Sequence, residues 1–263
     1  RENHTRKTPD WYGHCNGTSA AVARFQNPEK SVYRPKDCTP GSKYCTKFTP
    51  RDIRALLSEI AMNAKAKFIS GNRCSKTKDE IEDSPRRLNS LAMDSCQDIN
   101  PASFHIALVN FIRKQGQTLI FDKSQDKEVW NYPLYSYDYS AEKVSISKAL
   151  SVVGVSKSSW IFNPAAKDFV SVTMNVDYRN PSTRNFNYVG SKTRNKKTLT
   201  YKYILELDAN DNIIGGEWSK ENYSSHPDFL WMPFESAVAT GDRGRGNPMI
   251  SNENVISIWA ESM

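Results

Sequence analysis

The chain has 263 residues, a formal net charge of +7 and five cysteines. This length fits one large domain or two small ones and is enough to bury a substantial core. No apolar run approaches a membrane span, and Lys and Arg are scattered rather than clustered, which argues against a membrane span and a specific nucleic-acid partner. The first residue is Arg, and no apolar signal segment follows it, so we expect the numbering to begin at a processed or cloned boundary.

A cysteine stands where the first predicted helix begins, over residues 15 to about 25. Gly13 and Gly17 flank Cys15 and allow other segments to approach closely. The positive end of the helix dipole favours the thiolate, which is the nucleophilic form of cysteine. Cys15 is therefore the candidate nucleophile, and the alternative is a buried structural cysteine. The neighbouring His14 is expected to be structural, because adjacent side chains diverge at a helix entry.

The other four cysteines, Cys38, Cys45, Cys74 and Cys96, form an even set. The first two flank a turn-rich loop, and the last two flank a polar, charged segment. Two local disulfides are the natural arrangement in an oxidising compartment, although three pairings are possible and the sequence alone does not choose. We therefore expect a secreted, extracellular or periplasmic protein. No Cys-x-x-Cys or His pair accompanies these positions, so the spacing does not favour zinc.

A strong helix start follows at Thr49, with Pro50 at the first helical position and Asp52 at the dipole end. Apolar residues then recur at helical spacing as far as Phe68, and Gly71 is expected to end this helix. A polar segment extends from there to about residue 100.

The remainder is predicted to be mainly β. Residues 104–112 and 117–121 are apolar, β-branched and separated by Arg-Lys-Gln-Gly, which predicts a hairpin. Alternating patterns over 170–178 and 199–207 predict two further strands, and residues 208–212 form a turn rather than a calcium loop. The second half is therefore expected to be largely antiparallel sheet.

His105 is the candidate general base, on the first strand of the predicted hairpin. If the turn centres on Lys114 and Gln115, Asp122 lies opposite Ala107, one diagonal step from His105 and within reach of its side chain. Asp122 would then orient the imidazole, as in Cys-His-Asp sites. Asn131 is the alternative orienting residue, and His226 is a rival base that Pro227 places in a loop.

At these residues the chain resembles the transglutaminase elicitor family of oomycetes, which also has bacterial members. The similarity lies in short segments spread from about residue 10 to residue 233. They are Gly13-His14-Cys15, Phe104-His105-Ile106-Ala107, Phe121-Asp122, Val129-Trp130-Asn131 with Pro133, Gly71 to Cys74, Cys96 to Asp98, Leu205 to Asp208, Gly215 to Trp218, and His226 to Trp231. Tyr132 and the residues after Pro133 depart from the surface peptide that plants recognise in this family. The loop between Cys38 and Cys45 looks like an addition.

The resemblance implies an α+β fold with a papain-like core, in which a nucleophile-bearing helix packs on an antiparallel sheet. We expect one catalytic domain over 1–263, with a helix-rich half over 1–140 and a mainly β half over 141–263. It implies Cys15, His105 and Asp122 as a triad, acyl transfer from glutamine side chains to lysine or other primary amines, and no metal or cofactor.

The backbone N–H of Cys15 and the indole of Trp11 are candidates for an oxyanion hole. An apolar channel leading to the thioester would exclude water and so favour attack by an amine over hydrolysis. Candidate walls for this channel are the aromatic residues Trp11, Tyr12, Trp130, Trp218 and Trp231, each of which is as readily an ordinary core or surface residue.

Three alternatives to the transglutaminase hypothesis remain. The same triad could serve a cysteine protease or peptidoglycan peptidase, or a glutamine deamidase in which water takes the acyl group. A non-enzymatic recognition module would instead act through the surface loop around Trp130 and bind cell-wall or host surface proteins. A missing or buried thiol at Cys15 would favour the recognition module.

Overall fold

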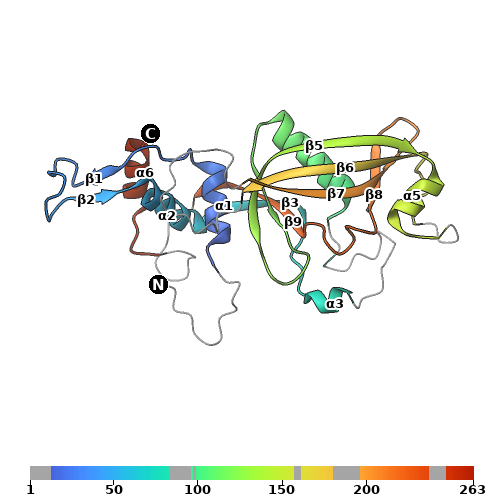
Figure 1. Cartoon of the computed structure of the whole chain (residues 1–263), viewed down its shortest axis with the longest axis horizontal. Helices are drawn as coiled ribbons and strands as arrows, with labels where there is room; N and C mark the ends of the chain where they lie inside the picture. The colour runs from blue at the N-terminus through green and yellow to red at the C-terminus, as the bar shows by residue number, and fades with distance from the viewer. Residues whose placement is uncertain (1–12, 83–95, 97–98, 157–160, 180–195, 237–246) are drawn as a thin grey trace. The chain divides into compact units, whose positions relative to one another are not determined.

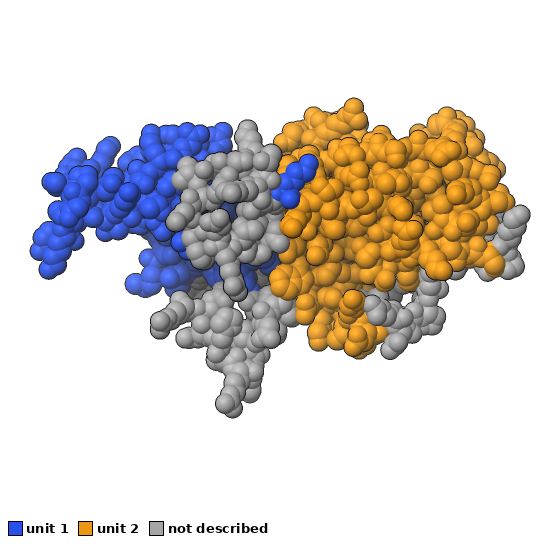
Figure 2. Space-filling model, in the orientation of Figure 1, with its two compact units in different colours: residues 1–67, 180–196, 233–263 blue, residues 68–179, 197–232 orange. Residues whose placement is uncertain are grey.

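The computed structural model describes residues 13–82, 96, 99–156, 161–179, 196–236 and 247–263. Its contacts divide the chain into two compact units (Figure 2). Unit 1 comprises residues 1–67, 180–196 and 233–263, and unit 2 comprises residues 68–179 and 197–232. The expected halves over 1–140 and 141–263 of a single domain are a different description of the chain from these two units.

In the part of unit 1 that the structure describes lie helices α1, α2 and α6 and a small hairpin (Figure 1). Helix α1 packs against α2 and the short 3₁₀ helix η1, and α2 also packs against α6. A Cβ on Gly17 would lie 2.4 Å from the carbonyl oxygen of Ser58, so glycine permits the close approach of α1 to α2. The elements are α1 (Cys15–Arg24), β1 (Val32–Arg34), β2 (Thr46–Phe48), α2 (Pro50–Ile60), η1 (Ala61–Asn63) and α6 (Asn252–Glu261).

The predicted start of the second helix is confirmed. The Thr49 hydroxyl accepts from the Asp52 backbone N–H at 3.3 Å, and the Asp52 carboxylate accepts from the Thr49 N–H at 2.8 Å. The predicted end is wrong, because α2 stops at Ile60 and residues Ala64–Gly71 form strand β3. Pairing of β3 with β9 at the sheet edge outweighs local helical propensity.

The main sheet has seven strands in the order β3-β9-β4-β5-β6-β7-β8. The pairs β4–β5, β4–β9, β5–β6 and β7–β8 are antiparallel, and β5 and β6 form a long ribbon (Figure 1). The strands predicted over 170–178 and 199–207 are confirmed as β6 and β7. The bounds are β4 (Leu119–Asp122), β5 (Asn131–Val144), β6 (Asp168–Arg179), β7 (Lys196–Leu207), β8 (Ile213–Trp218) and β9 (Phe229–Ser236).

The predicted hairpin over 104–121 is wrong in its first half. Residues Pro101–Ala107 form helix α4, which continues as the π-helical segment η2 (Leu108–Lys114). Asn100 caps α4, since its side-chain oxygen accepts from the Ala102 N–H at 2.8 Å. Phe104 and Leu108 lie one helical turn apart and are both buried in the main core of unit 2, which explains why this apolar run folds as a helix.

Two further helices complete unit 2, α3 (Lys78–Glu82) and α5 (Ile146–Val153). Helix α5 packs on β6 and encloses a second apolar cluster that includes Leu150, Phe162 and Ile204. The fold is therefore mixed α+β with a seven-stranded antiparallel sheet. Among the described residues, no helix has the length and apolar character needed to cross a membrane.

Candidate functional site

Cys15 is the first residue of α1, is half-buried and takes part in neither disulfide. His14 precedes the helix, and its Nδ1 lies 3.2 Å from a carboxylate oxygen of Glu59 on α2. This contact within unit 1 fits the structural role expected of His14. Trp11 and Tyr12, the expected partners of the thiol, lie outside the described residues.

His105 lies in unit 2, on helix α4 rather than on the predicted strand. Its side chain is nearly buried, its Nδ1 lies 2.8 Å from the hydroxyl of Tyr203, and its ring packs edge-on against Tyr139. Burial lowers the pKa of His105, so the imidazole is neutral at physiological pH and can accept a proton. The hydroxyl of Tyr203 holds the ring in one orientation.

The aromatic wall beside His105 borders a pocket of about 410 Å³. Tyr139, which contacts the His105 ring, lines this pocket together with Tyr137 from β5 and Arg113 from η2. Convergent polar and aromatic groups are typical of small-ligand sites. The sequence pattern around His105 gives no sign of this pocket, since its other walls come from β5.

Asp122 ends strand β4 and is fully buried. Its Oδ1 accepts from the Trp130 backbone N–H at 2.8 Å and from the Ser124 N–H at 3.3 Å. Its Oδ2 is buried and has no hydrogen-bond partner among the described residues. Burial raises the pKa of Asp122 to about 7, against the opposing effect of the two N–H groups.

The structure does not bring His105 and Asp122 together. Asp122 pairs with Asn131 in β5, not with Ala107, so the predicted register is wrong. Tyr139, beside His105, lies eight residues farther along β5 (139 − 131), which is about 26 Å of extended strand at about 3.3 Å per residue. The described partner of the His105 ring is Tyr203 instead. Sequence reasoning missed Tyr203, because only the packing of α4 against the sheet reveals it.

Asn131 and Trp130 both lie beside Asp122, at the start of β5. The Asn131 side-chain oxygen accepts from the indole N–H of Trp231 at 2.8 Å, and Asn131 and Trp231 are both buried. Trp130 is 37% exposed, and its indole N–H donates to Glu128 at 2.9 Å. Asn131 therefore stabilises the sheet here, whereas Trp130 presents an aromatic face to solvent.

The rival base His226 is a buried residue of unit 2. Its ring stacks on Trp218 at 5.1 Å with an interplanar angle of 7°, and its Nδ1 lies 2.8 Å from the carbonyl of Pro227. Burial lowers the pKa of His226 to about 4. Trp218 is itself buried in the main core and donates its indole N–H to the carbonyl of Ile99 at 2.9 Å. Both residues therefore have evident packing roles.

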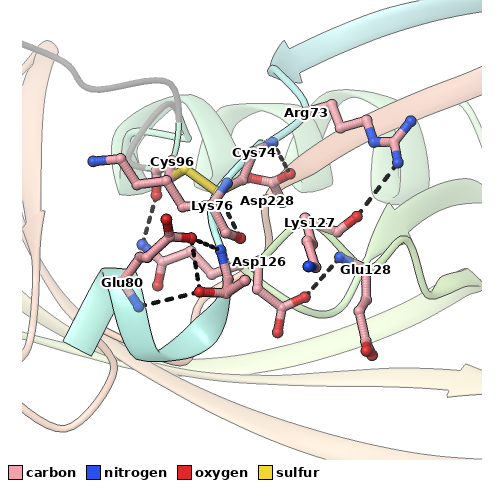
Figure 3. The surroundings of a disulfide bond; sticks show 11 residues. Arg73, Cys74, Lys76, Glu80, Cys96, Asp126, Lys127, Glu128 and Asp228 are labelled. Atoms are coloured by element: carbon pink, nitrogen blue, oxygen red, sulfur yellow. Dashed lines mark hydrogen bonds between the residues drawn. A yellow bond between two sulfur atoms is a disulfide. The ribbon is translucent and has the colours of Figure 1, made fainter. Parts of the chain in front are cut away.

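The two expected disulfides are confirmed as Cys38–Cys45 and Cys74–Cys96. Figure 3 shows the second bridge with its neighbours from the β4–β5 loop and from the segment before β9. The Cys74 N–H donates to the Asp228 carboxylate at 2.7 Å, and the Gln125 side chain donates to the Cys96 carbonyl at 2.6 Å. The Lys127 N–H also donates to the Lys76 carbonyl at 2.7 Å. This bridge therefore braces the loop that leads to Trp130.

No group of three or more His, Cys, Asp or Glu residues suited to a metal ion occurs among the described residues. The acidic stretch that could suggest calcium forms the expected turn between β7 and β8. The Asp208 carboxylate accepts from the backbone N–H groups of Asn210 and Asn212 at 2.8 and 2.9 Å. Its oxygens are thus used to hold the turn.

The mixed α+β fold, with its seven-stranded antiparallel sheet, is also found in a solved enzyme structure. The crystal structure of the GP42 transglutaminase from Phytophthora sojae matches with a TM-score of 0.72 and 26% sequence identity, over 97% of this chain and 64% of that one. This chain thus spans just under two thirds of that structure. The transglutaminase elicitor family model matches residues 2–242, and the chain belongs to this family. A search of curated proteins found no match.

Proposed function

We propose that the chain is a protein-glutamine γ-glutamyltransferase that forms isopeptide bonds between glutamine side chains and lysine or other primary amines. Membership of the transglutaminase elicitor family carries this proposal. Its likeness to a solved transglutaminase at 26% identity supports it further. The two disulfides and the family are consistent with a secreted protein.

In the proposed reaction, the neutral imidazole of His105 takes the proton of the Cys15 thiol, and the resulting thiolate attacks the carbonyl carbon of a glutamine carboxamide. The tetrahedral intermediate collapses to a thioester, and ammonia leaves with a proton delivered by the imidazolium of His105. A primary amine then attacks the thioester and loses a proton to His105, which releases the isopeptide and regenerates the thiolate. Water in place of the amine gives glutamate, the deamidation product.

The supporting features differ for each residue. Cys15 stands at a helix start outside both disulfides, and His105 is neutral, nearly buried and beside a pocket. We propose Tyr203 as the positioning residue for the His105 ring, because its hydroxyl is 2.8 Å from Nδ1. Asp122, which the structure does not place beside His105, stays a separate candidate, since a buried carboxylate with a strongly raised pKa is typical of functional sites.

A recognition role is the second candidate function, and one observation favours it. Trp130 is exposed at the end of a loop that Asp122 and the Cys74–Cys96 bridge both hold in place. A braced, exposed aromatic residue is suited to anchor a protein partner. Binding through Trp130 would not require the Cys15 thiol, so the two functions can be separated by mutation.

The test is incubation with a glutamine-containing protein and a labelled primary amine, with amine incorporation and ammonia release both measured. We expect incorporation by the wild type and none by Cys15→Ser, which changes one atom of the thiol. Iodoacetamide under native conditions should label Cys15 and none of the other four cysteines.

Each outcome of this experiment separates one alternative. Ammonia without incorporation indicates a deamidase, and cleavage of the protein chain indicates a protease. Full activity of Cys15→Ser, or labelling at a second cysteine in active protein, contradicts the assignment of the nucleophile. Inactivity of the wild type in every assay, with retained binding to cell-wall or host surface proteins, favours the recognition role.

A further inference from the structure

Strand β5 has a long edge that no described strand covers. β4 pairs with β5 only over Asn131 to Leu134, whereas β6 continues along β5 as far as Val144. In the order of the sheet, β4 and β6 are the two neighbours of β5. Among the described residues, 135–144 of β5 therefore have no strand partner on the side where β4 stops.

The backbone along this edge carries hydrogen-bonding groups that point away from the sheet. In an antiparallel ladder, every second residue turns its N–H and C=O away from the partner strand. Among the described residues, only β6 is hydrogen-bonded to the backbone of residues 135–144. Residues 138–143 are also exposed. Such an edge is a template for a further strand.

The pocket of about 410 Å³ lies at this edge rather than over one face of the sheet. Five consecutive residues of β5, 135–139, line it. Successive side chains of a strand point to opposite faces, so a pocket that touches all five must reach the backbone between the faces. Ile112 and Arg113, on η2, form its other wall. The space beside this backbone is therefore not filled by another described element.

The two sides of the sheet differ along this edge. Tyr137 and Tyr139 stack with ring centroids 6.2 Å apart on the side of α4, since Tyr139 contacts the His105 ring. Arg113 lies beside Tyr137, because its positive charge lowers the pKa of that hydroxyl against the effect of burial. Asp138 lies on the opposite side, because it alternates with the two tyrosines along the strand. An added strand would meet aromatic rings and a cation on one side and a carboxylate on the other.

We propose that the β5 edge binds an extended polypeptide segment, which adds to the sheet as a further strand beyond the end of β4. Its backbone pairs with the outward N–H and C=O groups of residues 135–144, and an acidic side chain on its α4 side pairs with Arg113. This inference rests on the proposed acyl transfer, for which it supplies the way in which a protein substrate is held beside His105. Binding itself needs no thiol, so it can be measured where acyl transfer is absent.

The test uses the full chain with Cys15→Ser, which separates binding from acyl transfer. The probe is the heptapeptide fluorescein-Val-Thr-Glu-Lys-Val-Thr-Val-amide, and its binding is followed by fluorescence anisotropy. N-methylation of alternate backbone nitrogens gives two further peptides with the same side chains, one methylated at odd and one at even positions. We expect one of the two to bind about tenfold more weakly, because it loses hydrogen bonds to β5, and the other to bind like the parent.

Hydrogen exchange locates the bound peptide on the chain. Alternate amides within residues 136–143 of the ¹⁵N-labelled protein should become protected when the peptide is added, because every second N–H then gains an acceptor. Equal binding of the two N-methylated peptides, or protection confined to residues outside β5, would overturn the proposal. Protection of the same amides without peptide, as the concentration of the chain rises, would assign the edge to a second copy instead.

Two variants test the charged contact. Arg113→Ala should weaken binding roughly threefold, as is typical of an exposed ion pair, and remove the preference for the parent over a peptide with Glu and Lys exchanged. Lys114→Ala is the matched control, since Lys114 is also an exposed cation on η2 but does not line the pocket. Equal binding by the two variants would contradict the role of Arg113. Peptide binding by a wild type that incorporates no amine would contradict the acyl transfer alone.

Discussion

Burial changes the charge state of Asp122 between the folded and the unfolded chain. Its pKa is about 7 in the folded protein against 3.8 for the free side chain. Between these two values the folded state binds more protons than the unfolded state. The free energy of unfolding therefore falls as pH rises from about 4 to about 7, by an amount on the order of 4 kcal/mol.

We predict that Asp122→Asn removes this pH-dependent fall in the free energy of unfolding. The amide keeps one oxygen for the Trp130 and Ser124 N–H groups but cannot ionise. Relative to wild type, the variant should gain stability between pH 4 and pH 8, as measured by urea unfolding at both values. His226 imposes the opposite slope, because its folded pKa of about 4 lies below 6.5, but it does so equally in both proteins. A stability difference that is the same at both pH values contradicts the prediction.

The activity of the same variant decides the catalytic role of Asp122. If Asp122 takes part in catalysis, Asp122→Asn should lower amine incorporation far more than Asn131→Ala, by roughly a hundredfold, which is less than the ten-thousandfold seen in a serine triad. If Tyr203 alone positions His105, Tyr203→Phe should instead shift the pH profile of kcat/KM, with Asp122→Asn close to wild type. Circular dichroism checks that each variant is folded. A dead Asn131→Ala beside an active Asp122→Asn would show that Asn131, and not Asp122, is needed for activity.

At the scale of elements, the contact of α1 with α2 depends on Gly17. A methyl group there would lie 2.4 Å from the Ser58 carbonyl and 2.6 Å from the Met62 sulfur. We predict that Gly17→Ala destabilises the protein by about 1–3 kcal/mol, the usual cost of overpacking. Gly13→Ala is the matched control, since nothing lies within 4 Å of a Cβ at Gly13. Equal thermal melts for the two variants would show that α1 can move away from α2 without cost.

The two disulfides should contribute unequally to stability. The Cys74–Cys96 bridge closes a separation of 22 residues and is buried, whereas Cys38–Cys45 closes only 7. Loop-closure entropy then gives about 3 kcal/mol for the first and about 2 kcal/mol for the second. The double variant Cys74→Ser/Cys96→Ser should also weaken two hydrogen bonds beside the bridge, from Gln125 to the Cys96 carbonyl and from the Cys74 N–H to Asp228. Urea unfolding of each double variant checks the order, and a larger loss for Cys38→Ser/Cys45→Ser reverses it.

Local signals predicted some elements well and others poorly. Thr49-Pro50 marked α2 correctly, and the equivalent signal Asn100-Pro101 starts α4 in the same way. The run after His105 is rich in residues that favour strands, and this pattern predicts a strand despite the helix-start signal at Asn100-Pro101. That error placed His105 on the wrong element and gave Asp122 the wrong partner. The contact between His105 and Tyr203, 98 residues apart, depends on long-range packing that no local pattern encodes.

For the whole molecule, the composition of the chain does not predict its division into two compact units. The chain passes between the two units at residues 67, 179, 196 and 232, so neither unit is one continuous segment. A division at residue 140 would cut β5, which runs over Asn131–Val144 and pairs along most of its length with β6. The proposed catalytic residues are likewise distributed, with Cys15 in unit 1 and His105 in unit 2. Their local sequence context made each a candidate, and the family resemblance implied that they act together.

The stack of Trp218 on His226 provides an optical reporter inside unit 2. A protonated imidazole quenches indole emission more strongly than a neutral one, and the pKa of His226 is about 4 in the folded state. Fluorescence from Trp218 should therefore stay bright through the neutral range and dim in acid. Subtracting the spectrum of Trp218→Phe isolates this signal from the other five tryptophans. Loosening of the core would expose His226 and raise its pKa toward the ordinary value, so the resulting change in Trp218 emission would report it without an attached dye.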